Sequence, residues 1–244
     1  MLHTERKRIN PSAKSAVLFL HGIVGSPGHF EKFYPLIPES VSYHAVLLEG
    51  HGGSVKDFGR AKMRMWKKQV SEALDALRST HERVIIVGHS MGTLFALQMA
   101  AENADKITDL FLLDSPLKAY LHPIMIKYST QFLFKYSNKY DPRSLAATDA
   151  VAVRSDPFVW RYLAWIPRFL ELFTEIKRTR PLLEKINVST VFYQSYHDEL
   201  VPRSAVKYIK EQENVKLNIL KNSTHFYYDD TDMNSMISDF KTLF

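Results

Sequence analysis

The stretch VIIVGHSMGTLF at residues 84–95 places the strongest constraint on what this chain can fold into. Its first four residues are β-branched and apolar, which is typical of a buried strand, and apolar residues resume at once with helical spacing. Ser90 lies at the junction, with Gly88 and Gly92 on either side. A serine that only caps a helix does not require glycine on both sides, so the pattern favours a nucleophile at a strained strand-to-helix corner.

The rest of the chain alternates short apolar runs with helical segments. The predicted strands are Ala16–Leu20, His44–Leu48, Val84–Val87, Asp109–Leu113, Thr190–Gln194 and Lys216–Leu220. The predicted helices are Ala61–Ser79, Met91–Glu102, Pro202–Glu211 and Thr231–Leu243. Short, almost continuously apolar strands are typical of a parallel sheet that is covered on both faces. The alternation therefore predicts an α/β fold with a mostly parallel central sheet flanked by helices.

The glycines indicate which edge of this sheet is functional. All nine lie at or before residue 92, and all except Gly59 follow closely on the first three predicted strands. The carboxyl ends of parallel strands form the edge at which open α/β sheets bind ligands. Glycine also favours ordinary loops, but that preference does not explain its confinement to one edge. We therefore expect the functional site there.

Residues 118–181 interrupt the alternation and contain no strand pattern. They include the aromatic-rich runs LHPIMIKYSTQFLFKYSNKY and FVWRYLAWIPRFLELF. We expect residues 118–181 to form a helical cap over the functional edge, inserted into a core made of residues 1–117 and 182–244. The alternative is an ordinary pair of amphipathic helices packed into the core.

Composition removes several classes of protein from consideration. The chain has no cysteine, which excludes disulfides, thiolate metal sites and a cysteine nucleophile. The amino-terminal apolar run is too short for a signal peptide, and no run approaches the about 18 residues of a membrane span, so we expect a cytoplasmic protein. The net charge is +6, but the basic residues are scattered and no nucleic-acid motif accompanies them. A mildly positive surface leaves transient contact with a lipid surface open.

A serine nucleophile needs a base to take its proton and an acid to orient that base. When serine occupies such a corner, the acid and then the histidine follow it along the chain, in loops after later strands. Asp198 and His225 follow the predicted strands at residues 190–194 and 216–220. We therefore assign Ser90 as the nucleophile, Asp198 as the acid and His225 as the base.

Other acids and histidines also follow Ser90 in the sequence. Asp114, which ends the run FLLD, is the main rival to Asp198. The weaker alternatives are Glu199, Asp229 and Asp230. Among the histidines, His122 falls within the expected cap and His197 adjoins the acid itself, so neither is favoured as the base.

The attack would create an oxyanion, which needs backbone N–H donors that are already in place. We expect one donor at Met91, the residue after the nucleophile, and the other at Ile23 in the loop LHGIVG. His21 in the same loop is expected to support it through hydrogen bonds.

These motifs resemble those of α/β-hydrolases, and within that superfamily the bacterial carboxylesterase and monoacylglycerol lipase branch. The matching segments are LFLHGIVGSP, LLEGHGGS, VIIVGHSMG, FLLDSP, HDELVP and STHF. The resemblance implies the α/β-hydrolase fold, a Ser-Asp-His esterase and a lid between strands six and seven of the family sheet. Two features depart from the branch: Ser195 stands where glycine is common, and the short amino terminus leaves little room for both antiparallel edge strands.

We therefore expect a serine hydrolase that cleaves carboxylic esters with an apolar acyl group and needs no metal or organic cofactor. Its expected partner is a small-molecule ester, and the sequence does not indicate an oligomeric state. Amidase, thioesterase and carbon–carbon bond hydrolase activities share the triad and stay open. So does a protein of another class, a non-catalytic ligand-binding protein on a hydrolase scaffold.

Overall fold

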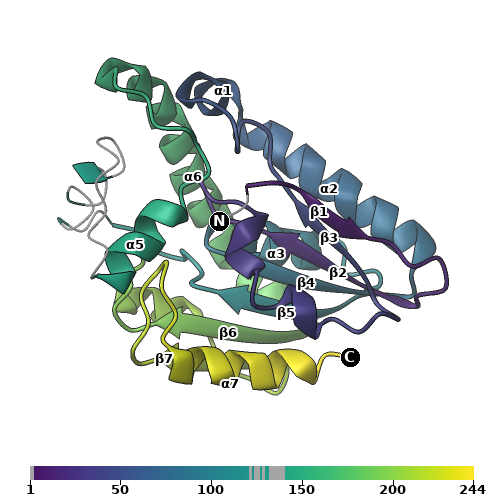
Figure 1. The fold of residues 1–244 in the computed structure, drawn as a ribbon. Helices are drawn as coiled ribbons and strands as arrows, with labels where there is room; N and C mark the ends of the chain where they lie inside the picture. Colours follow the sequence, from purple (N-terminus) through teal and green to yellow (C-terminus); the bar gives the residue numbers. More distant parts are fainter. Residues whose placement is uncertain (1–2, 121–122, 124–126, 128–129, 132–140) are drawn as a thin grey trace.

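A computed structural model of the chain describes residues 3–120, 123, 127, 130–131 and 141–244. Within these ranges, seven strands form one sheet in the order β1-β3-β2-β4-β5-β6-β7 (Figure 1). The strands are β1 (Arg6–Arg8), β2 (Ser15–Leu20), β3 (Ser42–Val46), β4 (Arg83–His89), β5 (Ile107–Leu113), β6 (Ser189–Ser195) and β7 (Val215–Leu220). Every neighbouring pair is parallel except β1 and β3. The predicted α/β fold with a mostly parallel sheet is confirmed.

Helices of several lengths connect these strands. The α-helices in the described ranges are α1 (Val55–Arg60), α2 (Met63–Thr80), α3 (Met91–Glu102), α5 (Pro142–Asp149), α6 (Ile166–Thr179) and α7 (Asp230–Lys241). The 3-10 helices there are η1 (Pro27–Phe30), η2 (Tyr34–Leu36), η3 (Val159–Trp165), η4 (Arg180–Lys185) and η5 (Arg203–Tyr208). No helix in the described ranges is long and apolar enough to cross a membrane.

The sheet is covered on both faces, as its apolar strands predicted. Leu18 and Leu20 of β2 belong to one buried cluster, which also holds Trp66 of α2 and the apolar residues of α3. Val17 and Phe19 of the same strand belong to a second cluster, formed with η1 and α7. Because successive side chains of a strand point to opposite faces, each strand from β2 to β7 contributes to both clusters.

Two strand predictions need correction. The predicted strand His44–Leu48 is displaced, because the observed strand begins at Ser42 and ends at Val46. Ser42 is polar but fully buried, and its hydroxyl bonds the ring of His81 at 2.8 Å, which satisfies it inside the sheet. The edge strand β1 was missed, because its sequence RKR carries no apolar signal.

Three of the four helix predictions are confirmed. The predicted helices Met91–Glu102, Ala61–Ser79 and Thr231–Leu243 overlap α3, α2 and α7. The predicted helix Pro202–Glu211 is wrong, because only the short 3-10 helix η5 forms there. The backbone of Ile209 is already extended, and the Gln212 N–H donates to the Val215 carbonyl at the start of β7. These residues therefore cannot continue the helix.

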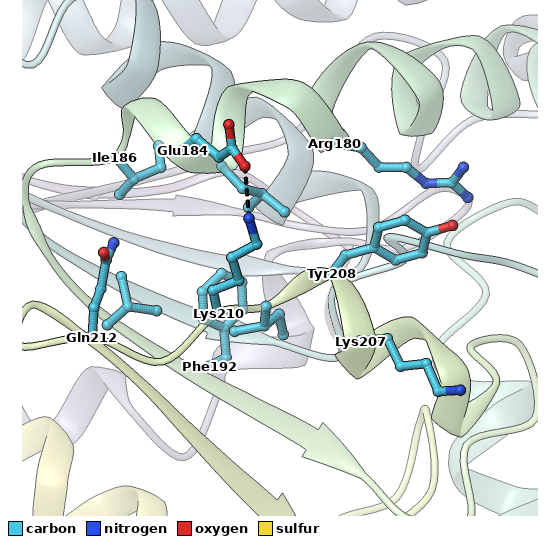
Figure 2. Close-up of a pocket in the computed structure, with 11 residues that line it drawn as sticks. Arg180, Glu184, Ile186, Phe192, Lys207, Tyr208, Lys210 and Gln212 are labelled. Carbon is cyan, nitrogen blue, oxygen red and sulfur yellow. Dashed lines mark hydrogen bonds and ion pairs between the residues drawn. The ribbon is translucent and has the colours of Figure 1, made fainter.

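A cavity of about 400 Å³ lies beside η4 and η5 (Figure 2). The residues that line it include Phe192 in the middle of β6 and Val215 at the start of β7. Arg180, Lys207 and Lys210 line it as well, and Lys210 pairs with Glu184 across it. The cavity is therefore separate from the loops at the carboxyl ends of the strands, where the predicted site residues lie.

Candidate active site

Ser90 lies at the corner between β4 and α3. Its backbone has φ 51° and ψ −122°, a conformation that non-glycine residues seldom adopt. The Ser90 N–H donates to the Leu113 carbonyl of β5 at 2.9 Å, and the Ser90 carbonyl accepts bonds from the N–H and hydroxyl of Thr93. The Ser90 side chain makes no capping hydrogen bond to α3. The corner is thus held by its backbone, and the hydroxyl is available for another partner.

The glycines around Ser90 permit close packing. A Cβ atom at Gly92 would lie 2.0 Å from the Leu20 carbonyl oxygen, and one at Gly22 would lie 2.9 Å from the Ser90 Cβ. A Cβ atom at Gly88 would lie 2.9 Å from backbone atoms of Thr93. Side chains at these three positions would therefore push β2, the loop after it and α3 apart.

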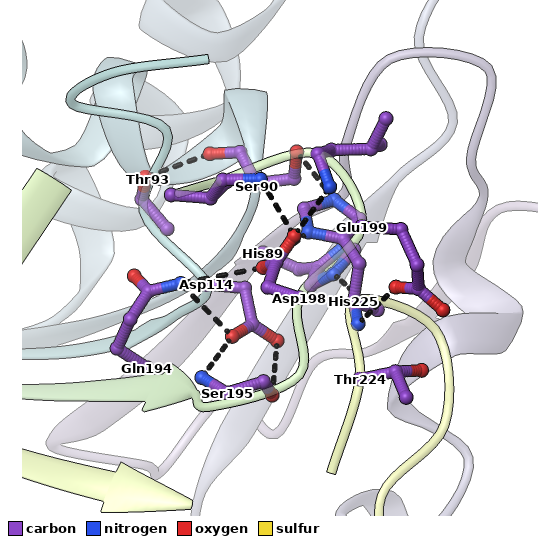
Figure 3. A network of polar contacts seen from close by, with 12 residues as sticks. His89, Ser90, Thr93, Asp114, Gln194, Ser195, Asp198, Glu199, Thr224 and His225 are labelled. Atoms are coloured by element: carbon purple, nitrogen blue, oxygen red, sulfur yellow. Dashed lines mark hydrogen bonds and ion pairs between the residues drawn. The ribbon is translucent and has the colours of Figure 1, made fainter. Parts of the chain in front are cut away.

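The predicted triad residues are in contact. The Ser90 Oγ lies 3.0 Å from His225 Nε2, and His225 Nδ1 lies 2.8 Å from Asp198 Oδ2 (Figure 3). The side chains of His225 and Asp198 are 2 % and 0 % exposed. Three groups from the ends of β4, β6 and β7 thus form one continuous chain of hydrogen bonds.

The acid of this chain is held by its own loop. Asp198 Oδ1 accepts hydrogen bonds from the backbone N–H groups of Leu200 and Val201, each at 2.7 Å. The side-chain amide of Gln194 contacts Oδ2 at 3.3 Å. These donors satisfy the carboxylate and leave Oδ2 directed at His225.

Two residues that the sequence analysis did not assign to the site hold the backbone of His225. The His225 N–H donates to Glu199 Oε2 at 2.9 Å, and His89 Nε2 donates to the His225 carbonyl at 3.1 Å. Glu199, weighed as a weaker acid, therefore contacts the main chain of the histidine. His89 lies inside the Gly-His-Ser motif, but no sequence signal connects it to a loop 136 positions away.

Electrostatics make His225 a strong base. Burial alone would lower the pKa of His225, but the Asp198 carboxylate opposes this effect and raises the pKa to about 9. A carboxylate that stabilises the imidazolium favours transfer of the serine proton to the ring.

Asp114, the main rival acid, is bound elsewhere. Its carboxylate accepts hydrogen bonds from the Ser195 N–H at 2.7 Å and from the Tyr228 hydroxyl at 2.8 Å. Burial, reinforced by the nearby Asp198 carboxylate, raises the pKa of Asp114 to about 7. Ser195, at the position where the branch often has glycine, thus binds Asp114. The acid that contacts the ring nitrogen of His225 is Asp198.

The loop after β2 lies against Ser90, as the expected oxyanion site requires. Within the described ranges, neither the Ile23 nor the Met91 N–H donates a hydrogen bond to the protein. His21 Nδ1 donates to the Gly22 carbonyl at 2.8 Å, and Nε2 accepts from the Leu48 N–H at 3.1 Å. Burial lowers the pKa of His21 to about 4, so its ring is neutral at pH 7. His21 therefore supports the loop.

The remaining candidates do not join the relay. Asp229 accepts a hydrogen bond from Thr231 at the start of α7, and Asp230 is a surface acid close to Lys32. The backbone N–H of His197 donates to the Ser223 carbonyl, and its side chain is exposed. His122 lies outside the described residues.

One group in the described ranges has the composition of a metal site. Potential ligand atoms of His89, Asp114 and His225 lie within 4.8 Å of one another. Both ring nitrogens of His225 are already hydrogen-bonded to Ser90 and Asp198, and the Asp114 carboxylate is bonded to other groups. The hydrogen-bonding pattern therefore favours proton transfer over metal binding.

The sheet topology and the strand-to-helix corner define an α/β hydrolase. The profile of the Alpha/beta hydrolase family matches residues 17–233, and the chain belongs to this family. The expected resemblance to its esterase and monoacylglycerol lipase branch is confirmed.

Three known proteins illustrate this similarity. The monoglyceride lipase homolog of Monkeypox virus is 21 % identical over 241 residues, which is 90 % of this chain and 84 % of that protein. The probable lysophospholipase BODYGUARD 3 of Arabidopsis thaliana is 35 % identical over 114 residues, but the match covers 43 % of this chain and only 22 % of that protein. The structure of a metagenome-derived lipolytic enzyme superposes with a TM-score of 0.75 at 17 % identity and covers 99 % of this chain and 96 % of its own.

Proposed function

We propose that this α/β hydrolase cleaves carboxylic esters with an apolar acyl group through an acyl-enzyme on Ser90. The observation that carries the proposal is the relay from Ser90 Oγ to His225 Nε2 at 3.0 Å and from His225 Nδ1 to Asp198 Oδ2 at 2.8 Å. A serine hydroxyl bonded to an imidazole that is itself oriented by a buried carboxylate is the arrangement used for acyl transfer.

In the first half of the proposed reaction, His225 takes the Ser90 proton while Oγ attacks the ester carbonyl. Asp198 stabilises the resulting imidazolium. The tetrahedral intermediate then collapses, the alcohol leaves with the proton from His225, and the acyl group stays on Ser90. In the second half, His225 takes a proton from water while the water oxygen attacks the acyl carbonyl. The second tetrahedral intermediate then collapses: its bond to Ser90 Oγ breaks, His225 returns the proton to Oγ, and the acid is released.

We assign stabilisation of the oxyanion to the N–H groups of Ile23 and Met91. Gly22 supports this assignment, because it lies so close to Ser90 that a Cβ atom there would be 2.9 Å from the Ser90 Cβ. Donors that are fixed before the reaction stabilise the developing charge without reorganisation.

We also propose that residues 118–181 form a cap that covers the acyl group. The segment after α5 supports this role, because the Ala152 N–H donates to the Val24 carbonyl at 2.6 Å and the Arg154 N–H donates to the Gly53 carbonyl at 2.9 Å. These bonds join the proposed cap to the loops after β2 and β3. The lipolytic names of the relatives support an ester with an apolar acyl chain.

The test is hydrolysis of p-nitrophenyl esters of graded acyl length, together with labelling by a fluorophosphonate. We expect the Ser90→Ala variant to lose about 10⁴-fold or more in kcat and all labelling. The exposed Ser79 serves as the control, and Ser79→Ala should retain both activity and labelling. Labelling that persists in Ser90→Ala would remove the nucleophile from the proposal.

A further inference from the structure

An exposed apolar surface runs along η3 and the first part of α6. It consists of Phe158, Val159, Trp160, Leu163, Ile166, Leu170 and Phe173, each between 40 % and 64 % exposed. We call these seven residues the apolar face. An apolar set this large on consecutive elements differs from the isolated exposed hydrophobic residues that occur on most proteins.

The charged residues of the same segment are buried or paired. Arg168 of α6 is buried, donates to the Gly59 carbonyl at 3.2 Å and pairs with Glu171. Glu175 is also buried, where it accepts hydrogen bonds from Lys67 at 3.3 Å and from the Gln98 side chain at 2.8 Å. The other charged residue within residues 157–174, Arg161, has a side chain that is 33 % exposed and pairs with Asp156. The segment thus keeps its charges paired and directs its large apolar side chains outward.

This outward orientation is held in place by α1. The Trp165 indole N–H donates to the Val55 carbonyl at 3.0 Å. Gly59 lies so close to η3 that a Cβ atom there would be 2.7 Å from the Ala164 Cβ. The side chains of Tyr162 and Trp165, which lie between residues of the apolar face in the sequence, pack against the core cluster. The apolar face is therefore a fixed surface.

Cationic groups border the apolar face. Lys56 and Arg60 are exposed on α1, the helix that packs against η3, and Lys177 follows Phe173 by one turn of α6. Within the described ranges, none of these three cations forms a salt bridge. The chain as a whole carries a net charge of +6.

We propose that the apolar face docks the protein onto an anionic lipid surface. Trp160, Leu163 and Leu170 would insert among the lipid chains at the interface, while Lys56 and Lys177 contact the anionic head groups. Apolar and aromatic side chains flanked by Lys and Arg are the combination that binds such surfaces. A two-fold contact between two copies would bring the same cationic borders together, which disfavours self-association. The inference goes beyond the proposed function and does not depend on hydrolysis by Ser90.

Co-sedimentation with vesicles tests this proposal. The vesicles would contain phosphatidylcholine alone or phosphatidylcholine with about 30 mol % phosphatidylglycerol. Binding is measured in the Ser90→Ala background, so that turnover does not change the lipid and failure of the catalytic proposal leaves the result interpretable. We expect binding to the phosphatidylglycerol vesicles, and the double variant Leu163→Ser/Leu170→Ser should bind at least about tenfold more weakly.

The controls separate docking from loss of fold and from self-association. Ile219→Ser replaces another exposed apolar residue, 42 % exposed on β7, and should bind like the parent protein. Lys56→Glu/Lys177→Glu should lose the preference for phosphatidylglycerol. Thermal melting of the Leu163→Ser/Leu170→Ser variant should match that of the parent protein, because both side chains are exposed. Failure of the parent protein to bind phosphatidylglycerol vesicles, or unchanged binding by the leucine variant, would overturn the proposal, as would a stable dimer in solution that this variant dissociates.

Discussion

Two buried carboxylates lie near His225, and their surroundings give them different tasks. Asp198 directs Oδ2 at the ring nitrogen and has its other oxygen bound by two backbone N–H groups. Asp114 is bound by Ser195 and Tyr228 and contributes charge without a hydrogen bond to the ring. Position after a strand made both acids candidates, and only the hydrogen bonds distinguish them.

Exchanging each acid for its amide should separate these tasks. We expect Asp198→Asn to lower kcat by about 10⁴-fold, because an amide supports the wrong tautomer of His225. Asp114→Asn should retain activity within about tenfold, since it removes no bond to the ring. Steady-state hydrolysis of a soluble ester measures both effects, with thermal melting to verify the fold. A larger loss in Asp114→Asn than in Asp198→Asn would reverse the assignment.

The pH dependence of kcat/KM should report the interaction between His225 and Asp198. The base must be neutral to accept a proton, so kcat/KM should rise with pH through the pKa of His225. Burial lowers this pKa, whereas Asp198 raises it to about 9. Asp198→Asn removes the largest raising contribution, so the ascending limb should move to lower pH even though the rate falls. Profiles of the parent, Asp198→Asn and the surface control Asp230→Asn measure the shift, and an unmoved limb in Asp198→Asn would contradict it.

At the scale of elements, the corner between β4 and α3 depends on backbone proximity. The β2 strand approaches α3 so closely that Gly92 has no room for a side chain. The sequence indicated this corner correctly because a buried strand, a tight turn and a helix follow one another within a few residues. It failed for η5, where the pairing of Gln212 with Val215 opposes a helical tendency.

Adding a single methyl group at Gly92 should test this constraint. In Gly92→Ala, the added Cβ would lie 2.0 Å from the Leu20 carbonyl oxygen, so backbone must move. We expect the free energy of unfolding to fall by about 3 kcal/mol or more. Gly53→Ala is the matched control: its Cβ would meet only the Asp57 side chain, which forms the capping box of α1, so it should cost about 1 kcal/mol. Urea unfolding curves compare the two variants. Equal losses of unfolding free energy would show that the close approach of Gly92 to Leu20 does not affect stability.

At the scale of the whole molecule, α6 is joined to the core by buried polar contacts as well as by apolar packing. Leu172 and Ile176 enter the core cluster, while Arg168 and Glu175 make hydrogen bonds beneath the helix. The outer side of the helix is then left apolar. The same arrangement therefore fixes the helix to the hydrolase core and creates the surface that we assign to lipid.

Arg168 should be a principal anchor of this arrangement. Arg168→Leu leaves the Gly59 and Ala61 carbonyls and the Glu171 carboxylate without their partner, so we expect a loss of about 3 kcal/mol in unfolding free energy. Arg178→Leu removes an exposed pair with Glu102 and should cost about 0.5 kcal/mol. Chemical denaturation measures both losses. Equal stabilities of the two variants would show that Arg168 does not anchor the helix.

The sequence by itself determined the fold class, the order along the chain of every strand except β1, and the candidates for the triad, with Asp198 preferred over Asp114 as the acid. These properties are local: an apolar run, a glycine-flanked corner or a polar residue just after a strand can be read within a few positions. The missed strand β1 and the wrong helix Pro202–Glu211 mark the limit of this approach, because partners distant in the sequence or opposed pairing decided them.

Only the tertiary structure decided which acid contacts His225, that Glu199 and His89 hold its backbone, and which side of α6 faces solvent. Each of these features depends on distances between segments that are far apart in the chain. An alternation of apolar and charged residues predicts a two-sided helix, but it does not state which side will face the core. That choice was made by what lies beneath the helix: the core cluster receives Leu172 and Ile176, and the Gly59 carbonyl binds Arg168, so the other apolar residues are left outside.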